Sequence, residues 1–176
     1  MNLKLAIKAL LLIATFFTLT SVINYKFERI QGHELSSNYI TMDERDRQLA
    51  CLAKNIYYEA GHEPFEGKVA VAQVTMNRTE SGRYPNDVCK VVHQKTVVYN
   101  KVICQFSWYC DQGPKLRPMD PTAYHESMEV AKKVLLENFR LPSLRGAMYY
   151  HADYIDPRWG KPKLIKIGRH IFYGEN

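Results

Sequence analysis

The stretch "NIYYEAGHEPFEGKVAVAQVTMNR", residues 55–78, decides the fold, because it contains the end of one helix and most of the next. A first amphipathic helix starts at Asp43, since apolar residues recur at three- and four-residue steps at Leu49, Leu52, Ala53 and Ile56. Gly61 predicts its end, and Pro64 forbids its continuation. A second helix is predicted from about Pro64 to about Glu80, with proline in its first turn.

Glu59 lies on the apolar stripe of the first helix, seven residues after Leu52. Burying an ionised carboxylate costs several kcal/mol unless it is paired. The C-terminal end of a helix also carries partial negative charge. Both effects predict a raised pKa and a protonated side chain. A protonated carboxyl among apolar neighbours suits a general acid for glycosidic cleavage, although a buried glutamate held by hydrogen bonds for structure alone is the alternative.

The other charged residues of this stretch do not form a metal motif. Glu59 and His62 have the E-x-x-H spacing of di-iron bundles, but Pro64 follows at once and no second E-x-x-H exists. The fifth position of "HEPFE" is Glu66, so the H-E-x-x-H zinc motif is absent as well. We therefore expect no metal and no cofactor. Glu63 and Glu66 are expected to be solvated at the start of the second helix.

The remainder of the chain predicts an α+β class with a mainly helical body. Asp120-Pro121 supplies an N-cap and first-turn proline for a third helix, whose apolar face carries Tyr124, Met128, Ala131 and Leu135. Residues 88–120 are mixed and rich in turns. Near the end, "GAMYYHADY" (146–154) and "KLIKIGRHIFYG" (163–174) are rich in β-branched and aromatic residues, which predicts two short strands.

The N-terminal segment predicts export. Lys4 and Lys8 precede an uncharged apolar run from Ala9 to Ile23, the pattern of an export signal, and a buried core helix is the alternative. The sequence after the run fits an A-x-A cleavage site poorly. We expect a signal-anchor or signal peptide at 1–25, a linker at 26–43 and a catalytic domain at 44–176. This places the domain at the periplasmic face or cell wall, membrane-anchored, or secreted if the signal is cleaved.

The cysteine content and the net charge limit the compartment and the kinds of partner that we expect. The four cysteines permit three pairings, and disulfides persist in oxidising compartments. Cys104–Cys110 is the favoured bridge because it would staple an irregular segment, whereas Cys51 fits a small buried hydrophobe. The net charge of +6 and the pI near 9.1 favour an anionic partner. The basic residues form no stripe and no nucleic-acid motif, so nucleic acid is not expected as a partner.

From Tyr57 through Arg78 the chain resembles the start of the catalytic domain of spore cortex-lytic, SleB-like cell-wall hydrolases, which have a Y-x-E-A-x-x-E-P-x-E-G-x-x-A-V-A-x-V-x-x-N-R pattern. Four further blocks resemble the family in order: "YPNDVCKVV" (84–92), "CQFSWYCD" (104–111), "AMYYHADYIDPRW" (147–159) and "IGRHIFY" (167–173). The resemblance covers about residues 48–174. Members often carry a separate peptidoglycan-binding domain, for which residues 24–42 are too short.

The resemblance implies a lysozyme-like, goose-type domain that acts as a lytic transglycosylase on peptidoglycan. We expect a monomer without a cofactor. It assigns the acid to Glu59. The acid would protonate the bridging oxygen between N-acetylmuramic acid and N-acetylglucosamine, and the 6-hydroxyl of the muramic acid would close on C1. Alternatives that remain open are a hydrolytic muramidase, an amidase that cleaves the lactyl–alanine bond, and a non-catalytic wall-binding module.

The resemblance also assigns substrate-binding roles. Gln105 resembles the polar cleft residue that orients an acetamido group, with Phe106 packed beneath it. Tyr149, Tyr150 and His151 lie on a predicted strand, where alternation predicts that either Tyr150 or the 149/151 pair faces the cleft. For the two tryptophans, Trp108 and Trp159, two roles remain possible, a platform for a sugar ring or a core residue.

Overall fold

The computed structural model describes residue 8 and residues 13–26, 41–111, 113 and 116–175. The chain divides into two compact units, Met1–Thr41 and Met42–Asn176. In the first unit residues 13–26 are helical, while the rest of the predicted signal-anchor and nearly all of the predicted linker lie outside the described residues. None of the helices in the described ranges combines the length and apolar character that crossing a membrane requires.

The first predicted helix is present as α2, Met42–Ala60, so the last two residues of the predicted linker belong to this helix. Gly61 follows its last residue, and only glycine fits there, because a Cβ would collide with the carbonyl oxygen of Tyr57. The second predicted helix is present as α3, Phe65–Glu80, with Pro64 as its N-cap. The breaks predicted from glycine and proline are thus confirmed within one or two residues.

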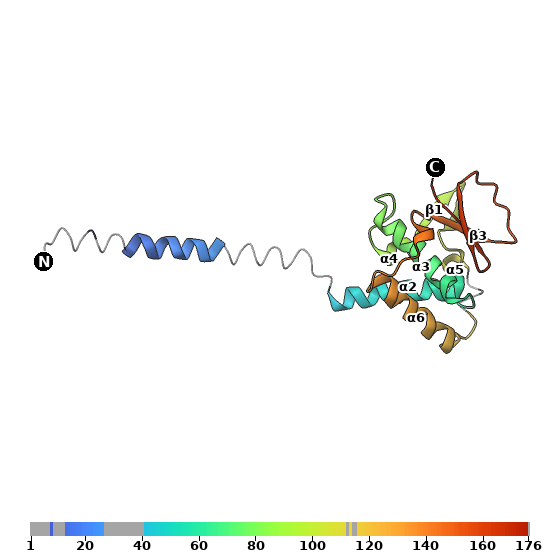
Figure 1. The fold of residues 1–176 in the computed structure, drawn as a ribbon, viewed down its shortest axis with the longest axis horizontal. Helices are drawn as coiled ribbons and strands as arrows, with labels where there is room; N and C mark the ends of the chain where they lie inside the picture. Colours follow the sequence, from blue (N-terminus) through green and yellow to red (C-terminus); the bar gives the residue numbers. More distant parts are fainter. Residues whose placement is uncertain (1–7, 9–12, 27–40, 112, 114–115, 176) are drawn as a thin grey trace. The chain divides into compact units, whose positions relative to one another are not determined.

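Helix α3 is the centre of the second unit, and it is buried on nearly every side. Val69, Ala72 and Met76 pack into one core with residues of α2, of α4 (Val88–Val92) and of α6 (Pro121–Leu135). Ala70 and Val74 pack into a second core with Leu144, Ala147 and Phe172. The helix therefore separates a helical layer from the late sheet (Figure 1).

Side-chain caps fix the starts of two of these helices. Asp120 begins α6 as predicted, and its carboxylate accepts hydrogen bonds from the backbone N–H groups of Thr122 and Ala123 at 2.9 and 3.2 Å. Asp87 caps α4 in the same way through Lys90 N at 2.7 Å. Two shorter elements complete the helical part, α5 at Ser107–Cys110 and the 3-10 helix η2 at Pro142–Leu144.

The late sheet has three antiparallel strands in the order β3-β5-β4: β3 Tyr149–Ala152, β4 Lys163–Ile167 and β5 His170–Tyr173. The prediction of two strands was wrong by one, because the second stretch folds back on itself at Gly168, where φ is +56°. Glu63, which was predicted to be solvated, is partly exposed, but it also has a partner in the fold. Its Oε2 accepts a hydrogen bond from Arg169 N at 3.0 Å and so fastens the β4–β5 turn to the loop before α3.

A second, two-stranded sheet was not predicted. Strands β1 (Lys95–Val98) and β2 (Lys101–Cys104) form an antiparallel hairpin within the segment that the sequence marked as mixed. Its turn residues Tyr99 and Asn100 both have positive φ, 47° and 61°. Sequence pattern missed it because the apolar residues do not alternate with polar ones.

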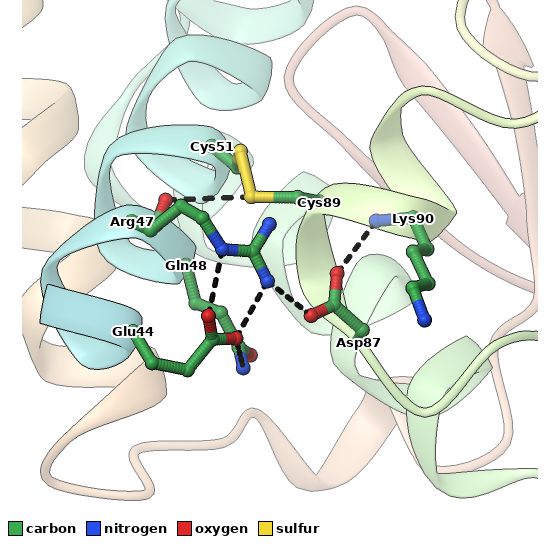
Figure 2. Close-up of a disulfide and its surroundings, with 7 residues drawn as sticks. All are labelled: Glu44, Arg47, Gln48, Cys51, Asp87, Cys89 and Lys90. Atoms are coloured by element: carbon green, nitrogen blue, oxygen red, sulfur yellow. Dashed lines mark hydrogen bonds and ion pairs between the residues drawn. A yellow bond between two sulfur atoms is a disulfide. The ribbon is translucent and has the colours of Figure 1, made fainter. Parts of the chain in front are cut away.

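Two disulfides staple the second unit. Cys104 and Cys110, the pair favoured from the sequence, are bonded at the base of the hairpin. Cys51 is bonded to Cys89, so the expectation of a free buried cysteine was wrong; neighbouring turns of α2 and α4 bring the two together. Figure 2 shows the guanidinium of Arg47 beside this bridge.

The ion-pair cluster beside the bridge joins the same two helices. Arg47 donates to both carboxylate oxygens of Glu44, at 2.8 and 2.5 Å, and to Asp87 Oδ2 at 2.5 Å. The bonds from Arg47, followed by that from Gln48, lower the pKa of Glu44 to about 2. The residue that caps α4 is therefore also held by α2 (Figure 2).

Candidate active site

A pocket of about 300 Å³ opens where α2, α3, the β2–α5 segment and β3 meet. Its walls contain one carboxyl group, one guanidinium, one amide, and several aromatic rings. The lining residues are Glu59, Arg78, Cys104, Gln105, Phe106, Ser107, Tyr149, Tyr150 and Trp159. Among these lining residues Glu59 carries the sole carboxylate. Five of the six residues predicted for the site, all but His151, are brought together here.

Glu59 lies in the last turn of α2 and is half-buried in the pocket wall. Its Oε2 accepts a hydrogen bond from the Tyr150 hydroxyl at 2.9 Å. Burial raises the pKa of Glu59 above its ordinary value, against the opposing effects of the Tyr150 hydroxyl and the positive charge of Arg78. Burial also raises the pKa of Tyr150, so the hydroxyl stays protonated and remains a donor. This arrangement favours the protonated form of a carboxyl that lines an open pocket.

Arg78 lines the pocket, and sequence reasoning missed it. It projects from α3 and is 3 % exposed. Its Nε and Nη2 donate to Met148 O at 3.0 and 2.7 Å, and its guanidinium carbon lies 5.2 Å from the ring centroid of Phe106. Burial lowers the pKa of this guanidinium. The sequence offered no clear signal for it, because the same helix also carries Lys68, a second buried basic residue.

Gln105 faces this guanidinium. With its amide oxygen turned toward the cation, Gln105 accepts from Nη1 and Nη2 of Arg78, both at 3.2 Å. Its backbone N–H donates to Gln94 O at 2.9 Å, which fixes the segment after β2. Phe106, the next residue along the chain, is 3 % exposed. The amide NH₂ group of Gln105 is thereby directed away from Arg78.

The two tryptophans have different roles. Trp108 is 4 % exposed, stacks on Tyr58 at 4.6 Å, and donates from Nε1 to Asn55 Oδ1 at 2.9 Å. Asn55 is fully buried and also donates to Thr75 Oγ1 at 3.2 Å. Trp108 is therefore a core residue that anchors α5. Trp159, by contrast, is 44 % exposed at the pocket wall, which leaves an indole surface open for a ligand.

The predicted alternation along β3 was wrong for this pocket. Adjacent residues Tyr149 and Tyr150 of the edge strand β3 both line it. His151 does not line it. The imidazole stacks on Tyr173 at 5.2 Å, and its Nε2 lies 2.9 Å from the Tyr173 hydroxyl. Its pairing with a strand neighbour removes His151 from direct contact with a ligand in the pocket.

Metal-binding groups do not gather at this site. Within the described ranges, no three His, Cys, Asp or Glu side chains lie close enough together to hold a metal ion. His62, which has the E-x-x-H spacing from Glu59, is exposed. The pocket instead offers a carboxyl with a raised pKa, a buried guanidinium and an aromatic wall, a set that suits proton transfer to a polar, uncharged ligand such as a sugar.

The sequence profile of the family described as Cell Wall Hydrolase matches residues 62–173, starting three residues after Glu59. The spore cortex-lytic enzyme of Bacillus subtilis strain 168 is 30 % identical over 131 residues, which cover 72 % of this chain and 37 % of that protein. The spore cortex-lytic enzyme of Bacillus cereus is 32 % identical over 133 residues, 73 % of this chain and 44 % of that protein. The chain thus spans less than half the length of these curated relatives.

Two solved structures are similar over most of the second unit. The catalytic domain of the Bacillus cereus SleB protein has a TM-score of 0.52 and 27 % identity, covering 73 % of this chain and 90 % of that chain. The catalytic domain of the germination-specific lytic transglycosylase SleB from Bacillus anthracis has a TM-score of 0.53 and 27 % identity, covering 77 % and 98 %.

Proposed function

The chain belongs to the Cell Wall Hydrolase family, and from this membership we propose that it cleaves peptidoglycan glycan strands as a lytic transglycosylase. The bond would be the one between N-acetylmuramic acid and N-acetylglucosamine. The observation that carries the proposal is the single carboxyl of Glu59, held with a raised pKa in a pocket with aromatic walls. The similar catalytic domain from Bacillus anthracis, named a lytic transglycosylase, supports the reaction type.

In the proposed reaction Glu59 first acts as an acid. Its proton goes to the bridging oxygen as the bond from that oxygen to C1 of the muramic acid breaks. The 6-hydroxyl oxygen of the same muramic acid then bonds to C1 and closes a 1,6-anhydro ring. The hydroxyl proton returns to the Glu59 carboxylate, so the enzyme is regenerated without water and without a second carboxylate.

The neighbours of Glu59 suit both halves of this cycle. Burial favours the protonated acid before the reaction, and the Tyr150 hydroxyl and the Arg78 charge favour the carboxylate that forms during it. Because these donors are already oriented in the folded protein, they need no rearrangement when the charge develops. A paired-carboxylate glycosidase would need a second carboxyl group within roughly 5–10 Å, and the described walls of the pocket contain only one.

Substrate-binding roles follow from the pocket walls. The free amide NH₂ of Gln105 would donate to an acetamido carbonyl, with Phe106 beneath it. Tyr149 and the exposed face of Trp159 would stack on sugar rings. His151 would act indirectly, by fixing Tyr173 against the Trp159 edge at 5.9 Å. The domain would share the lysozyme-like, goose-type architecture.

We also propose the surroundings in which the chain works. The two disulfides and the family support a location outside the cytoplasm. The N-terminal segment would serve as the export signal and, if it is retained, as a membrane anchor. Peptidoglycan would be the partner, and the chain would act as a monomer.

The test is mass spectrometry of muropeptides released from purified sacculi. The wild-type chain should release 1,6-anhydro-muropeptides, and Glu59→Gln should release none. Glu66→Gln is the matched control, since this exposed carboxylate lies at the start of α3 outside the pocket, and it should digest like wild type. Products with ordinary reducing ends would indicate a muramidase, and released stem peptides would indicate an amidase. Binding to sacculi without any cleavage would contradict an enzymatic function.

A further inference from the structure

The β1–β2 hairpin presents apolar side chains to solvent on both of its faces. Val97 and Val102, which are paired across the strands, are 68 % and 56 % exposed. On the opposite face, Val98 and Ile103 are 40 % and 53 % exposed. A two-stranded hairpin with no packed face is marginal in water, so these residues contribute little to its folding. The staple between Cys104 and Cys110 holds its base instead.

The tip of the hairpin also carries an exposed side chain that contributes nothing to folding. Tyr99 is 96 % exposed and has φ of +47°, a conformation that is unfavourable for a residue with a bulky side chain. Asparagine and glycine are the residues that two-residue turns of this kind prefer, and asparagine follows at position 100. Since the Tyr99 ring lies almost wholly in solvent, it gives no packing in return for the strain. We therefore expect the Tyr99 ring to contact a partner outside this chain.

From these two features we propose that the hairpin inserts its tip into the surface of an anionic lipid bilayer. An interface with one protein partner would cover one face of the hairpin, whereas insertion of the tip into a bilayer covers both faces at once. Exposed aliphatic side chains offer no hydrogen bonds to sugar hydroxyls, which argues against a glycan on this surface. A tyrosine at the tip suits the boundary between headgroups and acyl chains.

Charge complementarity sets the type of lipid. Residues 95–104 contain Lys95 and Lys101 and no acidic residue, so the hairpin carries two positive charges. Lysine side chains reach from an apolar surface to headgroup phosphates, which a negatively charged bilayer supplies. The helix at residues 13–26 is a second apolar surface of the same chain, with Phe16 and Phe17 65 % and 66 % exposed. A bilayer would take up both.

The proposal is tested at residue 99 itself, with the full chain and vesicles whose phosphatidylglycerol carries brominated acyl chains. Tyr99→Trp is compared with the parent, whose tryptophans are Trp108 and Trp159. The added emission should shift to shorter wavelength and be quenched by the brominated lipid. Attachment of the chain through residues 13–26 alone would leave this emission unshifted and unquenched. That result would overturn the proposal.

Matched variants in the Tyr99→Trp background separate the contributions. Val97→Ser/Val102→Ser should abolish the quenching, while Leu116→Ser, which changes an 83 % exposed leucine elsewhere, should retain it. Lys101→Gln should shift the onset of quenching to vesicles with more phosphatidylglycerol. Circular dichroism and the absence of free thiols establish that each variant is folded.

Two other outcomes would also overturn the proposal. A dimer in analytical ultracentrifugation that Val97→Ser/Val102→Ser abolishes, with no quenching, would assign the hairpin to a second copy of the chain. Loss of sacculus binding in that double variant, again with no quenching, would assign it to the wall polymer. Vesicle quenching is measured without substrate, so its result is independent of the muropeptide experiment.

Discussion

The hydroxyl of Tyr150 donates a 2.9 Å hydrogen bond to Oε2 of Glu59, across 91 positions of the chain. This bond joins the edge strand of the late sheet to the last turn of the first long helix. Because α3 separates the sheet from the helical layer, its packing on both sides determines whether the two groups meet. The candidate acid thus belongs to α2, and a tyrosine of β3 changes its pKa.

The ionisation of Glu59 predicts a pH dependence of both activity and stability. Its pKa in the folded protein lies above the ordinary value of 4.5, so its contribution to stability is complete below about pH 4.5 and is lost as the pH rises through the folded pKa. Activity that needs the protonated acid should fall over the same rise. Glu59→Gln should therefore unfold at a higher urea concentration than wild type at pH 7, with a flatter pH profile. An equal or lower midpoint at pH 7 would contradict a raised pKa.

Removing the Tyr150 hydroxyl should change the pKa of Glu59. In Tyr150→Phe the carboxylate loses a donor that favours its charged form, so the alkaline limb of kcat/KM should move to higher pH. The maximal rate should fall about ten- to a hundredfold, the equivalent of one hydrogen bond to a charged group. Tyr173→Phe is the control, because its hydroxyl lies beside His151 in the same sheet and outside the pocket. If the alkaline limb of kcat/KM moved equally in both variants, the change would come from the sheet and not from the loss of the bond to Glu59.

Arg78 should affect both stability and the acid. Arg78→Met leaves Met148 O without its two donors and should lower the free energy of unfolding by about 1–3 kcal/mol. It also removes a positive charge that lowers the pKa of Glu59, so the alkaline limb should move to higher pH. Arg78→Lys keeps the charge and should shift the limb less than methionine does. Urea unfolding measures the effect on stability, and pH–rate profiles measure the effect on the acid. An alkaline limb at the same pH in Arg78→Lys and Arg78→Met would exclude a role of the positive charge.

The two disulfides should differ in what their loss changes. Cys51→Ser/Cys89→Ser opens a bridge with a sequence separation of 38 and should cost about 4 kcal/mol, against about 2 kcal/mol for the separation of 6 in Cys104→Ser/Cys110→Ser. The second pair lies at the pocket, so its loss should reduce kcat/KM more than the first does at temperatures where both variants are folded. A reversed order in urea unfolding would contradict the chain-entropy argument.

Several features of the site could be predicted from the sequence because they are local. The three- and four-residue periodicity placed Glu59 on the buried stripe of α2, and burial with the helix end predicted a raised pKa; the structure has the raised pKa, with burial as its largest cause. Gly61 and Pro64 marked the break between α2 and α3. These predictions depend on contacts within one or two turns of the same helix, which sequence spacing specifies.

Other features depend on which distant segments pack together, and sequence pattern did not specify them. Arg78 meets Gln105 and Met148 only after α3 is enclosed by other elements, and on the sequence it is one arginine at the end of a helix. Tyr149 and Tyr150 both line the pocket, and they do so from an edge strand, a position that only the whole sheet defines. Glu63 was expected in solvent because the turn that it fastens lies 106 residues away.

The sequence by itself determined helices α2 and α3 with their ends, the start of α6, the mainly helical α+β class and one carboxyl that has to be buried, since each follows from side-chain order within a single element. Tertiary structure alone decided that a tyrosine and an arginine face that carboxyl and that Cys51 bonds to Cys89. The reason is that these contacts join residues 19 to 91 positions apart, and the packing of the two cores around α3 sets their distances.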